Sequence, residues 1–423
     1  MTWTNKHDRE LRERAMQVIP GGMYGHEATG MLPAEFPQFF QSGQGARTRD
    51  VDGNEYIDYM CAYGPNLFGY GYQPIEAAAQ AQRELGDTLT GPSEVMIDLA
   101  ESFVDLVSHA DWAMFCKNGT DATTMAMVIA RSYRGRKKIL CAQGAYHGAA
   151  PWCTPKLTGI TPEDRAHIVY FDYNDPQALA DAFKTHEGDV AGVFATPFRH
   201  EVFYDQYSPS LEYAQTARRL CDEAEALLIV DDVRAGLRLA RDCSWETIGV
   251  RPDLSSWGKC IANGHPISAV LGSEKARAAA KDIFVTGSFW FSAVPMAAAV
   301  AALKEVRESD YLERINASGQ MLRDGLDAQA RAHGFDISQT GPVVMPQILF
   351  RDDPLYRIGY GWVTECLKRG AYFHPYHNMF ISAAHTETEI KATLEITDQA
   401  FEAAKRNRDS YTVHPIVQAR FGS

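Results

Sequence analysis

The segment LIVDDVRAGLRLA, residues 228–240, decides the fold. Together with Leu227 it provides four consecutive apolar residues that end in two aspartates, Asp231 and Asp232. An apolar run of this length is typical of a strand buried on both faces. At least one aspartate is therefore expected at the carboxyl end of that strand. A carboxylate rarely lies beside a core without a cationic partner, so the partner of this carboxylate bears on what the protein binds.

The same pattern recurs between about residue 71 and residue 280, where short apolar runs alternate with helical stretches such as 120–135 and 210–226. Strand–helix alternation at this spacing is typical of βαβ units. We therefore predict an α/β fold in which a mostly parallel sheet lies between two layers of helices, with ligands at the carboxyl ends of the strands. The predicted strands are 112–116, 137–142, 167–172, 190–196, 226–232 and 266–272.

The two ends of the chain predict smaller lobes. Residues 45–60, GARTRDVDGNEYIDYM, indicate a hairpin around the turn Asp52-Gly53-Asn54. Beyond about residue 305 we expect a long helix, short strands and a final helix at 386–407, and the apolar stretch 288–303 is expected to form a buried helix. The predicted organisation is an N-terminal segment (1–70), a large α/β domain (71–305) and a C-terminal α+β domain (306–423).

The composition excludes several classes of protein. Of the 423 residues, 45% are hydrophobic and 22% are charged, as in ordinary soluble proteins, and the formal net charge of -13 argues against non-specific binding to nucleic acid or anionic lipid. The start of the chain lacks the apolar stretch of a secretory signal, and no run is long enough to span a membrane. Eight cysteines without metal-binding spacing favour a reducing compartment. We expect a soluble, cytoplasmic protein with no metal site and no nucleic-acid or membrane partner.

Residues 116–126, CKNGTDATTMA, connect the end of a predicted strand to a helix through a Gly-Thr turn. The free N–H groups and the positive end of the helix dipole would form a seat for a phosphate, and the Thr120 hydroxyl could add a donor. On these residues alone, the simpler interpretation is that Thr120 caps the helix.

Residues 144–151, GAYHGAAP, place Tyr146 and His147 between glycines, shortly after the strand that ends near Cys141. Glycine lets the backbone approach a ligand closely, and the ring of Tyr146 could cover a flat heterocycle. An ordinary loop with a packed tyrosine is the alternative.

Asp231 and Lys259 complete a set of four elements. A protonated pyridine nitrogen would satisfy Asp231, although an ion pair with Arg234 or Arg238 is the alternative. Lys259 stands between strand-like segments beside Trp257. Apolar surroundings disfavour the charged form of a lysine, and the neutral amine can attack a carbonyl, whereas most other lysines extend to the surface. A phosphate seat, a stacking aromatic ring, a carboxylate and a Schiff-base lysine together describe a site for pyridoxal 5'-phosphate.

These motifs resemble those of the class III aminotransferases, which are fold type I enzymes, and within them the glutamate-1-semialdehyde aminomutase-like branch. The resemblance covers nearly the whole chain, from VIPGG and DVDGNEYIDY through NGTDAT, GAYHG, LLIVDDVRAGLR, GVRPDLSSWGK and GHPISAVLG to YFHP and AAHTETEIKATLE. It implies a fold type I transferase that binds pyridoxal 5'-phosphate and forms a homodimer with its active sites at the interface.

The resemblance also implies roles for individual residues. Lys259 would form the Schiff base and act as the catalytic base, and Asp231 would pair with the pyridinium nitrogen. Val233 and Tyr146 would cover the two faces of the ring. The other implied cofactor-binding residues are Asn118, Gly119 and Thr120 at the phosphate, His147 beside Tyr146, and Ser288. Ser288, or alternatively Thr286, takes the place of the family's neighbouring-subunit threonine only after a shift in alignment.

The sequence departs from this branch on the substrate side. The aminomutase has a serine and an arginine after its P-G-G that bind a substrate carboxylate, but residues 23–30, MYGHEATG, contain no arginine, and the loop near 372–380 lacks the expected acid. We therefore expect at least one substrate without a carboxylate at the usual position, unless Arg199, Arg238 or an arginine of the neighbouring subunit takes over. The side chains expected to line the mouth are Tyr24, His26, Tyr63, His374, Tyr376 and His377.

The predicted function is transfer of an amino group from an amine or amino-acid donor to a ketone or aldehyde acceptor, in two half-reactions through pyridoxamine phosphate. The alternative is an intramolecular aminomutase, against which the missing arginine and loop acid both count, and a racemase is a third variant. A nicotinamide-dependent dehydrogenase would show G-x-G-x-x-G after an early strand, which this sequence lacks. A non-catalytic binding protein would have little reason to combine Lys259, Asp231 and Tyr146.

Overall fold

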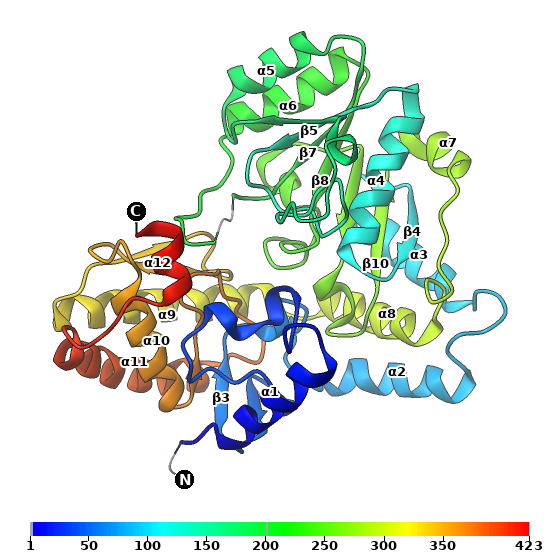
Figure 1. Cartoon of the computed structure of the whole chain (residues 1–423). Helices are drawn as coiled ribbons and strands as arrows, with labels where there is room; N and C mark the ends of the chain where they lie inside the picture. The colour runs from blue at the N-terminus through cyan, green and yellow to red at the C-terminus, as the bar shows by residue number, and fades with distance from the viewer. Residues whose placement is uncertain (1–2, 200–201, 423) are drawn as a thin grey trace.

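A seven-stranded sheet forms the centre of the molecule (Figure 1). The computed structural model describes residues 3–199 and 202–422. Neighbouring strands in the run β9-β8-β7-β5-β6 are parallel, whereas β10 is antiparallel to both β9 and β4. Six strands thus point the same way, which confirms the predicted mostly parallel sheet. In spatial order the strands are β4 (Trp112–Cys116), β10 (Ser268–Gly272), β9 (Leu254–Trp257), β8 (Leu227–Asp231), β7 (Val190–Ala195), β5 (Lys138–Ala142) and β6 (Ile168–Phe171).

Strand β8 shows how the layers are built. Successive side chains of a strand point to opposite faces of the sheet. Leu227 and Ile229 lie in a core shared with helices α4 (Gly119–Arg134) and α7 (Glu274–Asp282), and Leu228 and Val230 lie in a core shared with α3 (Val95–Leu106) and α6 (Leu211–Glu223). The three-layer architecture predicted from the alternating pattern is confirmed. The remaining helices of this part of the chain are α2 (Gln73–Leu85), α5 (Pro176–Thr185) and α8 (Ala293–Glu308).

The two ends of the chain share a smaller sheet. Strand β3 (Glu55–Asp58) is paired with β2 (Arg47–Asp50) in the predicted hairpin, and on its other side it pairs in parallel with β13 (Ala371–Tyr372). In Figure 1 the first 60 residues and the residues after 310 accordingly lie together on one side of the large sheet. The other elements of this region are α1 (Lys6–Val18), β1 (Phe40–Gln44), α9 (Tyr311–His333), β11 (Ile337–Thr340), β12 (Gln347–Phe350), α10 (Arg357–Lys368), α11 (Glu387–Asn407) and α12 (Pro415–Phe421).

Two predictions about this part of the chain are wrong in detail. The buried helix predicted at 288–303 begins only at Ala293, and Phe289 ahead of it is 64% exposed. Pro295 has no N–H to donate and fits the first turn of a helix, so the helix starts close to it. Helix α11 is not the last, because α12 follows it. The boundaries at 70/71 and 305/306 stay predictions, and α8 runs across the second of them.

The helices offer no membrane-spanning element. None of those in residues 3–199 and 202–422 combines the length and the apolarity needed to cross a bilayer.

Arg238 is a fully buried cation at the centre of the molecule. Its guanidinium donates hydrogen bonds to the carbonyl oxygens of Gly64 (2.7 Å) and Ile381 (2.5 Å) and lies over the ring of Phe380. Arg238 does not pair with the nearby carboxylate of Asp232, which accepts a hydrogen bond from the backbone N–H of Ser244 instead. Arg238 therefore ties the segment after β8 to two distant segments through backbone carbonyls.

Replacing Arg238 with methionine should destabilise the fold. Methionine fills part of the space but leaves the buried carbonyl of Ile381 without this donor and the carbonyl of Gly64 with only the weak thiol donor of Cys260, so we expect the free energy of unfolding to fall by about 2–4 kcal/mol. Urea denaturation followed by circular dichroism measures this. The matched control is Arg251→Met, which removes an exposed arginine paired with Glu246 and should change the free energy by less than about 0.5 kcal/mol. Equal midpoints for the two variants would contradict the role of Arg238.

Candidate active site

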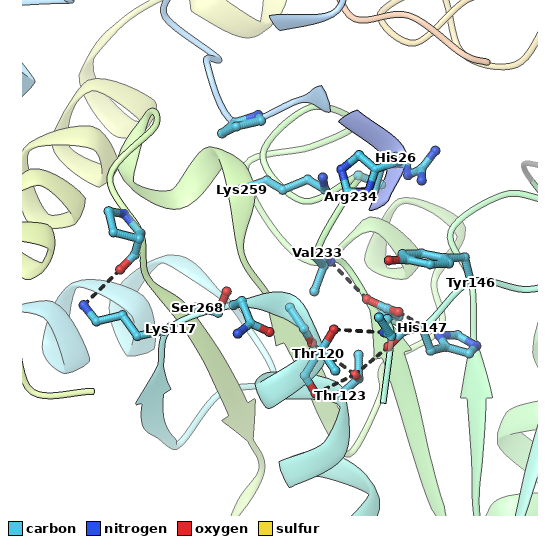
Figure 2. A pocket seen from close by; sticks show the side chains of 18 of the residues that line it. His26, Lys117, Thr120, Thr123, Tyr146, His147, Val233, Arg234, Lys259 and Ser268 are labelled. Carbon is cyan, nitrogen blue, oxygen red and sulfur yellow. Dashed lines mark hydrogen bonds and ion pairs between the residues drawn. The ribbon is translucent and has the colours of Figure 1, made fainter. Parts of the chain in front are cut away.

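A cavity of about 500 Å³ lies at the carboxyl ends of β4, β8 and β9. Figure 2 shows its lining, with Lys259, Arg234 and His26 together on one side and Thr120, Thr123 and His147 on the other. The parallel strands bring residues that are far apart in the sequence to one edge of the sheet, as the doubly wound architecture requires. The predicted site residues that line this cavity are Asn118, Gly119, Thr120, Tyr146, His147, Asp231, Val233 and Lys259.

The N-terminus of α4 forms one end of the cavity. Asn118 caps this helix, because its side chain accepts the N–H of Asp121 (3.0 Å) while the Asp121 carboxylate accepts the N–H of Asn118 (3.2 Å). The interpretation in which Thr120 is the cap is therefore wrong. Within the described residues no group accepts the N–H of Gly119 or Thr120. These free donors at the positive end of a helix suit an anionic group.

Two glycines let other segments come close to this helix end. A Cβ atom on Gly119 would lie 2.6 Å from Cγ1 of Val233. Gly148, whose φ is +118°, would place a Cβ 2.5 Å from the Thr120 hydroxyl oxygen. The Thr120 hydroxyl accepts the N–H of Ala149 (3.1 Å). Because neither position carries a side chain, the loop after β5 and the turn after β8 can both pack against the N-terminus of α4.

Asp231 lies at the end of β8, on the face that packs against α4. Its Oδ2 atom is 2.7 Å from Nδ1 of His147, and its Oδ1 accepts the N–H of Val233 (3.2 Å). The alternative in which Arg234 or Arg238 forms an ion pair with Asp231 is wrong, since both guanidinium groups have other partners. His147 thus contacts the carboxylate directly, and the carbonyl of His147 is fixed by the hydroxyl of Thr123 (2.7 Å).

Asp232, the neighbour of Asp231, points to the opposite face of the sheet. Burial raises the pKa of its carboxyl group to about 6, which the hydrogen bonds from Ser244 partly counteract. Only one carboxylate of the pair therefore reaches the cavity.

Lys259 follows β9 and reaches into the same cavity. Its backbone is in the left-handed region, with φ of +48°, a strained conformation for a residue other than glycine. Its Nζ donates a hydrogen bond to the carbonyl of Tyr63 (2.8 Å). Burial, and to a smaller extent the nearby guanidinium of Arg234, lower the pKa of the ammonium group to about 8. A much larger share of this lysine than of an ordinary one is therefore the nucleophilic neutral amine near neutral pH.

The residues predicted at the mouth separate into two groups. Tyr24 and His26 line the cavity, but Tyr63, His374, Tyr376 and His377 do not. Tyr63 lies behind His26, donating its hydroxyl to the His26 carbonyl (2.7 Å), with the two ring centroids 4.6 Å apart. His374 is buried, which lowers its pKa to about 3. Tyr63 and His374 therefore lie behind the residues that line the cavity and do not line it themselves.

Ser288 lies apart from the cavity. It is exposed in a turn ahead of α8, with Phe284, 90% exposed, and Phe289 nearby in the sequence. A contact between Ser288 and a phosphate would need a second copy of the chain. Within the part of the chain that the structure describes, no group of three or more acidic, histidine or cysteine side chains could hold a metal ion.

Several residues that line the cavity were not predicted from the sequence. Arg234 follows directly after the motif Asp231-Asp232-Val233, and its place at the strand's end is a signal that could have identified it as a cavity residue. Thr123 and Ser268 could have been found from their positions one turn into α4 and at the start of β10. The cavity residues of this kind are Glu27, Lys117, Thr123, Thr196, Arg234 and Ser268.

Comparisons with known proteins agree with this geometry. Residues 32–344 match the family model for class III aminotransferases. An aminopentol aminotransferase from Sphingopyxis macrogoltabida is 65% identical over 98% of each chain, and a glutamate-1-semialdehyde 2,1-aminomutase from Halorubrum lacusprofundi is 32% identical over 83% of this chain and 81% of that one. The solved structure of the FumI protein of Sphingopyxis sp. MTA144, in its pyridoxal-phosphate internal aldimine form, matches with a TM-score of 0.96 at 65% identity, covering 97% of this chain and 99% of that one.

This chain belongs to the class III aminotransferase family. It is a pyridoxal 5'-phosphate-dependent aminotransferase of fold type I, which confirms the fold, the enzyme class and the cofactor predicted from the sequence.

The lowered pKa of Lys259 predicts how the protein takes up its cofactor. The rate at which the cofactor-free protein binds pyridoxal 5'-phosphate covalently, trapped with borohydride, should rise with pH with its midpoint near pH 8. Because Arg234 contributes to the low pKa, Arg234→Gln should move the midpoint to higher pH. Arg165→Gln, which changes an arginine outside the cavity lining, should leave it unchanged. A midpoint near the ordinary lysine value would show that burial does not act on this amine.

Proposed function

We propose that this protein moves an amino group from an amine that carries no carboxylate to a carbonyl acceptor, in an active site that binds the cofactor through the predicted residues. The observation that carries the proposal is that Lys259, Asp231 and the helix end at Gly119 and Thr120 line one cavity. Each supplies a group that a different part of pyridoxal 5'-phosphate requires.

The residues present fit this cofactor. The open N–H groups of Gly119 and Thr120 would hold the phosphate, with Asn118 fixing the turn from its capping position. Asp231 would hold the ring nitrogen, and Val233 and Tyr146 would cover the two ring faces. The cradle depends on Gly119, since a side chain there would clash with Val233. His147 would act on the cofactor through Asp231, which makes it a positioning residue.

When bound, the cofactor supplies a carbonyl carbon that takes up the amino group and a ring that withdraws electrons from the neighbouring carbon. Lys259 removes a proton from the donor carbon with its neutral Nζ and returns one to the acceptor carbon in the reverse half-reaction. Asp231 keeps a proton on the ring nitrogen, and the bond from His147 keeps the carboxylate in place. Burial of the cavity residues keeps the positions of these groups fixed between the two half-reactions.

The aminopentol aminotransferase suggests the class of donor. An aminopentol, as the word says, is an amine that bears hydroxyl groups, and a carboxylate is no part of the name. This supports the expectation from residues 23–30, which contain no arginine for a donor carboxylate. We infer that a primary amine on a polyhydroxylated chain enters past Tyr24, which lines the cavity and is 74% exposed. The aminomutase from Halorubrum lacusprofundi is less identical to this chain (32%) than the aminopentol aminotransferase is (65%). We therefore do not propose an intramolecular reaction.

We further propose a cytoplasmic homodimer. All eight cysteines are free thiols, which supports a reducing compartment. The exposed phenylalanines ahead of α8, Phe284 and Phe289, are large apolar side chains of the kind that subunit interfaces bury. Ser288 lies between them in the sequence. If this turn packs on a second copy, Ser288 can reach the phosphate end of that copy's cavity.

The absorption spectrum tests the proposed function. We expect the purified protein with pyridoxal 5'-phosphate to show a visible band that disappears when a polyhydroxylated primary amine is added and returns when a carbonyl compound follows. Lys259→Ala should show no such cycle and no measurable amino transfer, because both the covalent anchor and the base are lost. Lys117→Ala, which removes the other lysine of the cavity, is the control and should keep the cycle.

Two results would count against the proposal. A band that never changes with any amine, while a single amino-carbonyl compound is isomerised, would mean an aminomutase. Full activity in Lys259→Ala would mean that the base is elsewhere.

The proposed dimer can be tested at the exposed turn. The double substitution Phe284→Glu and Phe289→Glu should convert a dimer into monomers in sedimentation velocity, because charges would be buried in the interface. It should also weaken the binding of pyridoxal 5'-phosphate, if Ser288 serves the partner subunit. Leu157→Glu, at an exposed apolar residue in a different loop, is the matched control. A double variant that stays dimeric would place the interface on another surface.

A further inference from the structure

Residues 61–64 form a turn whose backbone is left-handed at every position. The φ values are +47° at Cys61, +55° at Ala62, +62° at Tyr63 and +107° at Gly64. A left-handed angle is uncommon and costly for a residue other than glycine, and here three such residues follow one another. Strain of this kind persists only where the surrounding structure imposes it, and it clusters at functional sites. The cofactor chemistry above does not use this turn.

Polar groups of the neighbouring segments hold the turn in this shape. The carboxylate of Asp58 accepts the N–H of Met60 (2.7 Å) and the hydroxyl of Tyr70 (2.5 Å). The N–H of Gly64 closes the turn on the carbonyl oxygens of Met60 (3.2 Å) and Cys61 (3.0 Å). Asp58, Met60 and Tyr70 do not line the cavity, so they hold the turn without the help of a ligand.

The turn directs two successive carbonyl oxygens at the segment around Lys259. The carbonyl of Tyr63 accepts the hydrogen bond from Nζ of Lys259 (2.8 Å). The carbonyl of Gly64 accepts from Nη2 of Arg238 (2.7 Å) and from the thiol of Cys260 (3.2 Å). Lys259 is itself left-handed, with φ of +48°. Two strained backbones therefore meet at one hydrogen bond, and that bond involves the amine on which the chemistry depends.

The conformation of Ala62 does not serve the packing of its side chain, because that side chain is exposed. The backbone angles of a residue set the direction of the peptide groups on either side of it. At Ala62 the left-handed angles therefore aim the chain that carries the carbonyl of Tyr63. The hydrogen bond to Lys259 gives this strained turn a purpose that packing does not.

A carbonyl acceptor suits a lysine that acts as a base. The neutral amine has N–H groups to donate to the carbonyl while its lone pair stays available for a proton. Once Nζ is protonated, the same hydrogen bond is charge-assisted and stronger. A backbone carbonyl has no proton to exchange, so it orients Nζ without competing for the proton. The charged and titratable groups that act on Nζ from the neighbouring elements are His26, Glu27, Arg234, Arg238 and Cys260.

We propose that the left-handed turn at residues 61–64 is a positioning element for Lys259, whose Nζ is held by the carbonyl of Tyr63 while it acts as the base. This inference rests on the proposed function, in which Lys259 carries the proton. No bond to the turn forms or breaks covalently. A proton moves onto the lone pair of Nζ and leaves it again, and the carbonyl of Tyr63 keeps the amine in one place for both transfers.

The test changes the backbone preference at the exposed residue Ala62. Valine and asparagine are similar in size, but asparagine adopts left-handed angles readily and a β-branched residue does not. Proline holds φ near about −65° and cannot adopt the observed +55°. The measurement is the pH midpoint at which the cofactor-free protein captures pyridoxal 5'-phosphate covalently. The product is trapped with borohydride and assigned to Lys259 by peptide mapping.

We expect Ala62→Pro to lower the midpoint by about one pH unit, because the ammonium form loses an acceptor that stabilises it. Ala62→Val should lower the midpoint less, and Ala62→Asn should keep the wild-type value. The sign separates positioning from a general loss of structure, since a loosened wall would hydrate the amine and raise the midpoint. Glu225→Val, at another exposed left-handed residue outside the cavity lining, is the control for strain alone and should leave the midpoint unchanged.

A midpoint that is unchanged or raised in a folded Ala62→Pro protein would overturn the inference, as would equal shifts in Ala62→Val and Ala62→Asn. If circular dichroism shows that Ala62→Pro does not fold, Ala62→Val decides by the same criteria. A wild-type product on a lysine other than Lys259 would overturn the proposed function and this inference with it. A product on Lys259 with a midpoint that no variant moves would overturn the role of the turn alone.

Discussion

The buried carboxylate of Asp231 is the constraint on which the site depends. A carboxylate at the end of a core strand loses its hydration, and hydrogen bonds or a positive charge must replace it. His147 provides one such bond, 2.7 Å from Nδ1 to Oδ2, and Thr123 in α4 holds the carbonyl of His147 in turn. Strand, loop and helix are thereby locked into one arrangement. The group proposed to bind the ring nitrogen is positioned before any ligand enters, so that little ordering is left for the binding step.

The pleat of β8 assigns opposite roles to two identical neighbours. Asp231 follows Ile229 onto the α4 face, where the helix end, the cavity and His147 lie. Asp232 follows Val230 onto the other face, where its carboxylate accepts a hydrogen bond from the backbone N–H of Ser244. A shift of one residue in the strand register would exchange them and would leave the cavity without its carboxylate. The apolar run before the aspartates is therefore as important to the chemistry as the aspartates, because it fixes which one faces the cavity.

Much of this arrangement could be predicted from the sequence because it depends on local patterns. Apolar runs mark the strands, parallel strands end at one edge, and the residues just after them must meet there. Three kinds of feature were beyond that reasoning. The choice between Asn118 and Thr120 as helix cap depends on backbone angles at a single turn. The side chain of Arg234 points into the cavity because of the turn after β8, which has no periodicity. Tyr63 and His374 come from the smaller lobe, whose placement against the sheet depends on long-range pairing of β3 with β13.

The charges of the cavity also bear on the form in which the donor amine reacts. The helix end at Gly119 suits a phosphate, while the opposite wall carries the cationic side chains of Lys259 and Arg234. A positive wall disfavours the ammonium form of an amine and so raises the share of the neutral amine, which is the nucleophile. The donor amine would then meet Lys259 in the form that reacts, and its carbon would lie beside the lysine that takes its proton.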